Sequence, residues 1–355
     1  MEVRIYNNSM SFRGIIENQT SFLWNRKYND SGSFSLKVPI TPRNTELLRA
    51  GNIVWVRDKA EAGIIESLRF VLNHGERSLQ VDGRFLDAFM ARRLIRPQNG
   101  SGSSINFEGT VEDAMRTFFN DAAALPMVEL EERHGYTEEV SLQASYDNLL
   151  EYEQNLAKSA AYGLRFRPNF VEKKIVFEIY KGLDHTKGQN DRTRVVFSEE
   201  YANLNSIEYT YNDQVFFNVC YVEGEGQDDT DPQKLYVVVG DTESTGFARR
   251  EKHIEGKTQS NGLTIAQYRA KLEEEGRVEL DNSEEAESVN CVVNPYNNFI
   301  YGVHYDLGDI VTVEKKDWGL TKDFRITSIT EVYESEIPQI EVTLGTPLAD
   351  KIKWR

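Results

Sequence analysis

Several short runs could in principle support chemistry, and the first ends like a phosphate-binding loop. It reads Glu255-Gly256-Lys257-Thr258. Such a loop needs another glycine five residues before the Gly-Lys-Thr and an apolar strand leading into it. That position is Glu251, and the preceding run is ARREKHIE. Because a carboxylate would repel phosphate, the sequence predicts an ordinary charged loop here.

The sequence also contains residues of types that bind metals, but they do not form a complete metal-binding motif. Asp228, Asp229 and Asp231 lie close together and carry the oxygens that Ca²⁺ prefers. No glycine follows at the sharp-turn position and no glutamate closes the loop, so a solvated acidic turn is favoured. The histidines form no His-Glu-x-x-His and have no partner at metal-ligand spacing; they are His74, His134, His185, His253 and His304. The sequence therefore predicts no metal site.

Nucleophile motifs are equally absent from the sequence. There is no Gly-x-Ser-x-Gly, and Cys220 and Cys291 lie in the apolar runs FFNVCYV and VNCVVNP, which are typical of small buried hydrophobic residues. A hydrolase needs a pair of carboxylates, but 57 acidic residues give no reason to select one pair. We therefore expect no catalytic residue and no cofactor.

Composition and charge limit the classes of partner. The 355 residues carry 41 basic and 57 acidic side chains, a net charge of −16. An acidic excess disfavours wrapping nucleic acid or adhering to anionic membrane, yet suits a surface past which DNA must slide. No apolar run is long enough to span a bilayer, and the N-terminal run MEVRIYNNSMSFRG is no secretory signal. We expect maturation in a cytoplasm.

The elements that would position any site are mostly strands at first. Residues 21–40 alternate apolar and polar side chains on both sides of Asn29-Asp30-Ser31-Gly32, which predicts a hairpin. Further strand-like runs follow up to about Val81. Two amphipathic helices are then predicted, one capped by Thr110 and one starting at Ser145. Strands return after Gly163, and a helix with a capping box begins at Thr264.

A pattern near the N-terminus recurs near the C-terminus. Gly51-Asn52-Ile53-Val54-Trp55-Val56 precedes the strands GIIESLRF and RSLQVDG, and Gly308-Asp309-Ile310-Val311-Thr312-Val313 precedes FRITSITEVY and PQIEVTLG. Order, strand type and approximate spacing all agree. Many antiparallel proteins contain Gly-Asp before a β-branched strand, but the shared series favours duplication of a small barrel-like module.

Six runs in the same order carry a resemblance to a known family: FLWNRKYNDSGSFSLKVPI, GIIESL before VDGRFL, YGLRFRPNFVEKKIVFEIYKGLDHT, VVFSEEYANLNSIEYTYN, NVCYVEGEG, and YDLGDIVTV with FRITSITEVYE. From about Phe22 to Leu344 the chain resembles the Gp37-like tail proteins of long-tailed, siphovirus-type phages, which themselves resemble phage baseplate or tail-tip hub proteins.

The resemblance implies an α+β, mainly β fold, with two related small β-barrel modules and α/β insertions. We expect a first β-barrel module at 1–96, a helical α+β insertion at 97–165, joining strands at 166–225, a polar loop, strand and helix insertion at 226–288, and a second β-barrel module at 289–355.

The resemblance also implies a structural role. Three copies would form a trimeric, pseudo-sixfold ring that joins the hexameric tail tube and distal tail proteins to tip spike or fibre proteins. The ring would belong to the virion tail of a phage or phage-like particle, including a tailocin, assembled in the bacterial cytoplasm. DNA would pass through the ring without specific binding, and this chain would insert in no membrane.

Exposed charges on the repeated strands are the candidate tube-side contacts: Arg57, Lys59, Lys315 and Lys316. Ordinary solvated strand charge is an equally good reading of these residues. Two other functions stay open. One is a peptidoglycan or polysaccharide hydrolase at the tail tip, and the other is a host-surface binding module.

Overall fold

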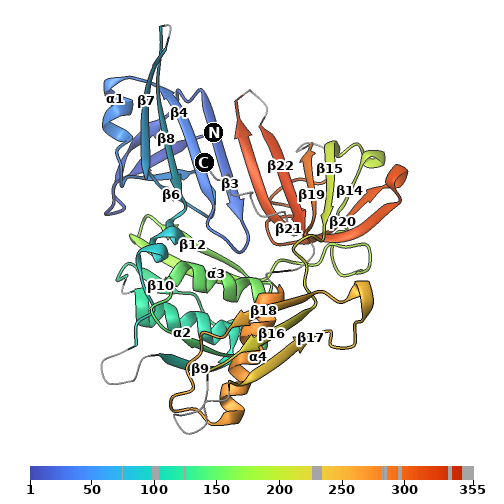
Figure 1. The fold of residues 1–355 in the computed structure, drawn as a ribbon. Coiled ribbons are helices and arrows are strands. Elements are labelled where there is room, and N and C mark those ends of the chain that lie inside the picture. Colours follow the sequence, from blue (N-terminus) through green and yellow to red (C-terminus); the bar gives the residue numbers. More distant parts are fainter. Residues whose placement is uncertain are drawn as a thin grey trace.

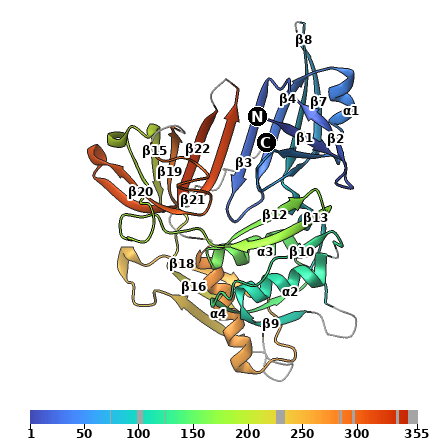
Figure 2. The same cartoon turned by 180° about the vertical axis from the view of Figure 1, so that it is seen from behind.

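The computed structural model describes residues 1–73, 75–97, 104–123, 125–225, 234–281, 283, 286–294, 298–334 and 338–345. Two β-rich modules lie side by side, and two α/β lobes lie on one side of both (Figures 1 and 2). We call them module A (1–84), lobe 1 (85–180), module B (181–212 and 286–345) and lobe 2 (213–285). His74 and the run from Asp228 to Asp231 lie outside the described residues.

Module A begins with the predicted hairpin. Strands β3 (Ser21–Lys27) and β4 (Ser33–Pro39) pair antiparallel, with Phe22 opposite Leu36. Side chains alternate between buried and half-buried along both strands, so that one face of the hairpin forms core and the other stays accessible. The hairpin predicted from the alternating pattern is therefore confirmed.

Two sheets enclose the core of module A. Strands β1 (Val3–Tyr6), β2 (Phe12–Ile16), β5 (Ile53–Val56) and β6 (Gly63–Ile64) form one sheet, in the order β2-β1-β5-β6. The other contains β3, β4, β8 (Glu76–Arg84) and β7 (Ser67–Asn73). Helix α1 (Pro42–Leu47) connects β4 to β5 and is capped by the Thr41 side chain. Trp24 and Phe85 pack at the centre of this core.

Module B is built from strands that precede lobe 2 in the sequence and strands that follow it. They are β14 (Val196–Ser198), β15 (Leu204–Asn212), β19 (Ala286–Val293), β20 (Ile310–Lys315), β21 (Leu320–Tyr333) and β22 (Gln339–Gly345). Turns η2 (Glu199–Tyr201) and η4 (Lys316–Trp318) lie between strands. Apolar side chains, including Val311, Ile329 and Cys291, fill its interior. Both cysteines are free and buried, as the sequence predicted.

One long sheet runs through both modules. Its described order is β15-β19-β22-β21-β3-β4-β8-β7, with β20 joined to β21 and β14 joined to β20. The pairing of β21 with β3 is the junction between the modules. Each neighbouring pair along this order is antiparallel.

Lobe 1 follows module A in the chain. It contains η1 (Leu86–Arg92), β9 (Ile105–Thr110), α2 (Val111–Ala123), β10 (Val128–Leu130), β11 (Glu139–Ala144), α3 (Leu149–Ser159), β12 (Gly163–Asn169) and β13 (Lys174–Tyr180). Both predicted helices are present, but the second begins later than expected. Asn148, not Ser145, accepts the first backbone N–H groups of α3, because its side chain occupies the cap position.

Lobe 2 is inserted between β15 and β19. Strands β16 (Val219–Glu223), β17 (Tyr236–Gly240) and β18 (Glu251–Glu255) form a sheet that packs on helix α4 (Ile265–Asp281), with turn η3 (Gly246–Ala248) between two of them. The capping box predicted at Thr264 is confirmed, since Thr264 and Gln267 bond reciprocally.

The chain is thus mainly β with a few helices, in agreement with the α+β expectation. The expected boundary at residue 165 falls inside β12, whose sheet belongs to lobe 1, and the expected boundary at residue 225 lies just after β16 of lobe 2. In the described part of the chain, no helix is both long and apolar enough to span a bilayer.

Candidate assembly surface at the module junction

The two runs that begin at Gly51 and Gly308 make matching backbone hydrogen bonds. The N–H of Gly51 donates to the Ile65 carbonyl over 2.8 Å, and that of Gly308 donates to the Ile326 carbonyl over 2.9 Å. In return, the Ile65 and Ile326 N–H groups bond residues 52 and 309, each over 2.8 Å. Both glycines have positive φ, 84° and 92°, which explains the residue type at the turn.

The match extends along three strands in each module. Each module contains an antiparallel meander of three strands. In module A it is β5, β6–β7 and β8, and in module B it is β20, β21 and β22. The break between β6 and β7 lies where β21 has a register shift, so that Ser67 corresponds to Ser328. Asp82 then corresponds to Thr343.

The hairpin beside each meander also matches. Hairpin β3–β4 pairs with β8 as β15–β19 pairs with β22, and Ser35 opposite Asp82 corresponds to Asn290 opposite Thr343. The modules differ at the other edge. Strand β1 lies antiparallel to β5, whereas β14 lies parallel to β20. The two modules therefore share a five-strand arrangement and differ in the strands added to it.

At the junction, β3 and β21 pair over six residues. Trp24 lies opposite Glu331, and Arg26 lies opposite Ile329. Arg26 and Glu331 both point toward the buried side of the sheet, and each is at most 5% exposed. A charged side chain in such a position needs a partner, because desolvating an isolated charge is costly.

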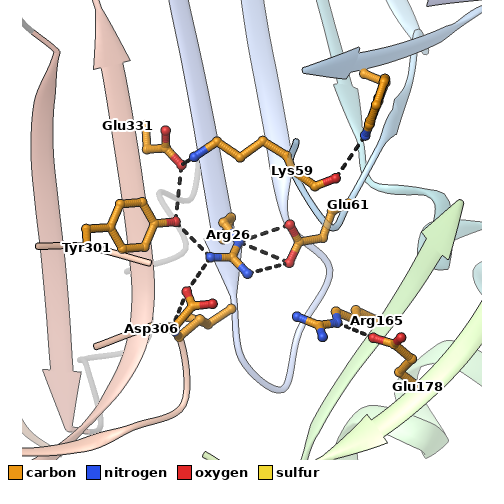
Figure 3. Close-up of polar contacts among 10 residues, drawn as sticks. Arg26, Lys59, Glu61, Arg165, Glu178, Tyr301, Asp306 and Glu331 are labelled. Carbon is orange, nitrogen blue, oxygen red and sulfur yellow. Dashed lines mark hydrogen bonds and ion pairs between the residues drawn. The ribbon is translucent and has the colours of Figure 1, made fainter. Parts of the chain in front are cut away.

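Arg26 has carboxylate partners from both modules (Figure 3). Its Nε and Nη2 donate to the Glu61 carboxylate of module A over 2.8 to 3.0 Å, while its Nη1 donates to Asp306 of module B over 2.5 Å. Burial alone would lower the pKa of Arg26, but Glu61, Tyr301 and Asp306 more than offset this and raise it well above its usual value. The guanidinium is permanently charged and joins the modules.

Glu331 is paired by a second cation. Lys59 of module A donates to it over 2.5 Å, and the Tyr301 hydroxyl donates to the same carboxylate over 3.1 Å (Figure 3). Tyr301 also accepts from Arg26 Nη1 over 2.7 Å. Burial raises the pKa of Tyr301 well above its usual value, so it remains a neutral phenol. These contacts link both cations and three carboxylates into one network.

Tyr28 connects the junction to lobe 1 and to the first residues of module B. The Tyr28 hydroxyl, next to β3, donates to the Ala161 carbonyl over 3.0 Å and accepts from the Gly182 N–H over 3.1 Å. Within lobe 1, Arg165 donates to Glu178 over 2.5 Å (Figure 3). The ring of Tyr28 also packs directly against Gly308, where an added Cβ would lie only 2.2 Å from a ring carbon.

The face of the long sheet that points away from both cores is polar. It carries hydroxyl and amide side chains, including Ser35, Asn25, Thr330, Asn290 and Ser206. Charges on the paired strands nearly balance there: Lys27, Lys37, Arg69 and Arg84 against Asp82, Glu208 and Glu341. The acidic excess of the whole chain is therefore not concentrated on this face.

The four predicted contact residues are not gathered in one place. Lys59 lies in the junction network with its side chain 23% exposed, whereas Arg57 is 57% exposed and pairs with Glu2. Lys315 is largely covered and pairs with Glu199. Lys316 is 72% exposed and pairs with Glu200. The structure thus separates two exposed charges from two that are used within the chain.

The positions of Arg26 and Glu331 along their strands indicate that both side chains are buried. Arg26 shares the strand parity of the apolar Phe22 and Trp24, and Glu331 shares that of Ile329. A charge at an inward position of an otherwise apolar strand calls for a buried partner.

The run that ends like a phosphate-binding loop has a structural role instead. The backbone N–H groups of Lys257 and Thr258 donate to the Glu275 carboxylate, each over 2.8 Å, so a side chain of the protein itself occupies these donors. Among the described residues, no three His, Cys, Asp or Glu side chains cluster closely enough to hold a metal ion.

Comparisons with known proteins place the chain. The family model described as Siphovirus ReqiPepy6 Gp37-like protein matches residues 2–346. The comparison with curated proteins finds no match.

Solved structures show the same fold. The 43 kDa tail protein of prophage MuSo2 from Shewanella oneidensis superposes with a TM-score of 0.61 at 14% identity, covering 98% of this chain and 99% of that one. A tail protein from Neisseria meningitidis gives 0.58 at 17% identity, covering 97% and 96%. A chain of a PdpA–VgrG complex gives 0.51 at 10% identity, covering 100% and 66%.

Proposed function

Since the chain belongs to the Siphovirus ReqiPepy6 Gp37-like family, we propose that it is the structural hub at the tip of a phage or phage-like tail. In this role three copies form a ring with pseudo-sixfold symmetry. The ring joins the hexameric tail tube to the spike or fibre proteins of the tip.

The repeated module is the observation that carries the proposal. Each chain presents the same meander and hairpin twice, in modules A and B, so a trimer presents it six times. A ring with threefold chain symmetry can then meet a sixfold tube with six similar surfaces. We propose that each module acts as one small barrel-like docking unit.

The polar face of the long sheet fits the wall of the ring's channel. Its hydroxyl and amide side chains and balanced charges give little net attraction for phosphate, so DNA can pass without being held. The role is mechanical, and we propose no catalytic residue and no cofactor.

Exposed charges on the repeated strands remain our candidate contacts with the tube. Arg57 and Lys316 are the stronger pair because their side chains are mostly exposed. Lys59 and Lys315 would contribute by holding the strand ends in place. The proposed location is the virion tail, after assembly in the bacterial cytoplasm.

Light scattering after size-exclusion chromatography tests the proposal, with the tube protein of the same particle added in a second run. We expect a trimer, or monomers that form rings only with tube protein. Electron microscopy of the rings should show sixfold density facing the tube. A protein that stays monomeric under both conditions, or that degrades cell walls and loses this activity on a single Glu or Asp substitution, would overturn it.

A further inference from the structure

The long sheet ends in two strands with different exposed side chains. Strands β7 and β15 are the end members of the described order, at opposite sides of the molecule (Figure 1). β7 carries three exposed apolar side chains at alternate positions: Leu68, Phe70 and Leu72. β15 carries Tyr209 and Tyr211, also exposed and also at alternate positions. Long edge strands with exposed apolar residues tend to pair with another strand.

The junction inside the chain shows which strands can pair. It joins the free edge of hairpin β3–β4 in module A to β21, the middle strand of the meander in module B. By the correspondence between modules, β15 is the counterpart of β3, and β7 is the counterpart of β21. The two end strands of the long sheet therefore correspond to the two strands of the internal junction, and could form a second junction of the same kind between two copies of the chain.

The register of such a junction follows from that correspondence. Trp24 lies opposite Phe34 and Tyr209 opposite Val289, while Phe34 and Val289 lie opposite corresponding residues of β8 and β22. Tyr209 therefore corresponds to Trp24. Phe70 corresponds to Glu331 in the same way, because they lie opposite Leu79 and Ile340.

We infer that β7 of one copy of this chain pairs antiparallel with β15 of the next, with Phe70 of one chain opposite Tyr209 of the other. In this register Leu68 lies opposite Tyr211, and Leu72 lies opposite Ile207. The inference rests on the proposed trimer and specifies its interface. Strand direction is consistent, since every neighbouring pair along the order from β15 to β7 is antiparallel.

The two kinds of junction differ in chemistry. Inside the chain, the buried side holds Arg26, Glu331 and their ionic partners. Between chains it would hold aromatic and aliphatic side chains that face one another in directly opposed pairs, which stabilise strand pairing. A charged strand edge does not substitute for an apolar one, so β3 cannot take the place of β15 without burying an unpaired charge.

Cysteine cross-linking tests the register. Phe70→Cys and Tyr209→Cys are made as separate variants and mixed as purified trimers that are allowed to exchange, or co-expressed with tube protein where assembly needs it. Mild oxidation should give a band of twice the chain mass only in the mixture, and the double variant should give a covalent trimer. The two native cysteines are buried and serve as a constant background.

The matched control moves one cysteine by a single residue. Arg69 neighbours Phe70 but points to the opposite face, so Arg69→Cys with Tyr209→Cys should cross-link weakly or not at all. Equal cross-linking of both pairs would overturn the register. Trimers in light scattering without the Phe70–Tyr209 cross-link would also overturn it, and would leave the hub proposal standing. Monomers throughout would overturn both.

A charge substitution gives an independent readout. Phe70→Glu should convert trimers to monomers, because it places a carboxylate in an apolar interface, and Tyr209→Lys in the same chain should restore them. Phe247→Glu is the control, since Phe247 is fully exposed in lobe 2 and away from both end strands. Circular dichroism should be unchanged for all variants. Trimers that persist with Phe70→Glu alone would contradict the inference.

Discussion

Among single residues, Arg26 is a direct link between the two modules. It is almost fully buried and its guanidinium is shared by carboxylates of both modules. Arg26→Ala would leave Glu61 buried without its cation. We expect a loss of about 3–5 kcal/mol in the free energy of unfolding, measured by denaturant titration.

Arg57→Ala is the control for this loss. Arg57 pairs with Glu2 at the surface, so its removal should change stability by less than about 1 kcal/mol. Similar effects of the two substitutions would show that the network adds nothing beyond an ordinary surface pair.

A buried carboxyl group predicts a dependence of stability on pH. Burial raises the pKa of Asp87 to about 7, against the hydrogen bond donated by Ser31 and with help from the charges of Asp30 and Glu61. The folded state therefore keeps a proton that the unfolded chain loses near its ordinary pKa. This contribution is complete below about pH 4 and is lost as the pH rises to about 7.

Asp87→Asn should remove that dependence. We expect the variant to match the parent protein near pH 4 and to exceed it at pH 8, by at most about 4 kcal/mol. Denaturation midpoints at both pH values provide the measurement, with the exposed Asp58→Asn as control. A variant less stable than the parent at pH 8 would contradict the assignment.

At the scale of elements, the two repeated turns have different surroundings. Both glycines have positive φ, but a Cβ at Gly308 would meet the Tyr28 ring, whereas a Cβ at Gly51 would meet nothing within 4 Å. Gly51→Ala should therefore cost about 1–2 kcal/mol from backbone strain alone.

Gly308→Ala adds a steric clash to the same strain. We expect an additional loss of about 1–3 kcal/mol and displacement of Tyr28 from its contacts with Ala161 and Gly182. Thermal unfolding compares the pair, and near-ultraviolet circular dichroism reports the tyrosine. Equal losses at the two glycines would show that the Tyr28 contact does not constrain the turn.

Elements with local signals could be predicted from the sequence. The β3–β4 hairpin follows from strict alternation around a turn sequence, and the repeat follows from a glycine before a β-branched strand. The start of α3 does not follow from the sequence, because Ser145, Asp147 and Asn148 are all residue types that cap helices, and in the structure Asn148 is the cap.

Elements that depend on distant partners could not be predicted. The partners of Arg26 include Asp306, 280 positions away, and nothing near either residue identifies the other. The ends of the long sheet are also set by tertiary packing. Alternation shows that β7 and β15 are strands, but only the topology shows that they are the outer ones.

At the scale of the whole molecule, the near-neutral face of the long sheet predicts weak DNA binding. Lysines placed on that face by Asn25→Lys, Ser35→Lys and Thr330→Lys should create affinity for duplex DNA that falls steeply with salt. Fluorescence anisotropy at low ionic strength measures this, and the parent protein should show little binding.

The control adds the same three charges elsewhere. Val171, Phe247 and Val303 are exposed and lie off the sheet face, so lysines there change net charge equally. If both triple variants bind DNA with the same affinity, net charge alone determines DNA binding, and the sheet face does not line a path for DNA. Stronger binding by the face variant supports its position along the channel.

The pairing of β3 with β21 also has a consequence for synthesis. Ser328 bonds Asn25 across 303 positions of the chain. At about 5–20 residues per second, the ribosome needs roughly 15–60 s to deliver the second strand after the first. During that interval the edge of β3 is open on every nascent chain. Neighbouring polysome products can exchange strands there, so expression at lower temperature or with chaperones should raise the yield of correctly closed protein.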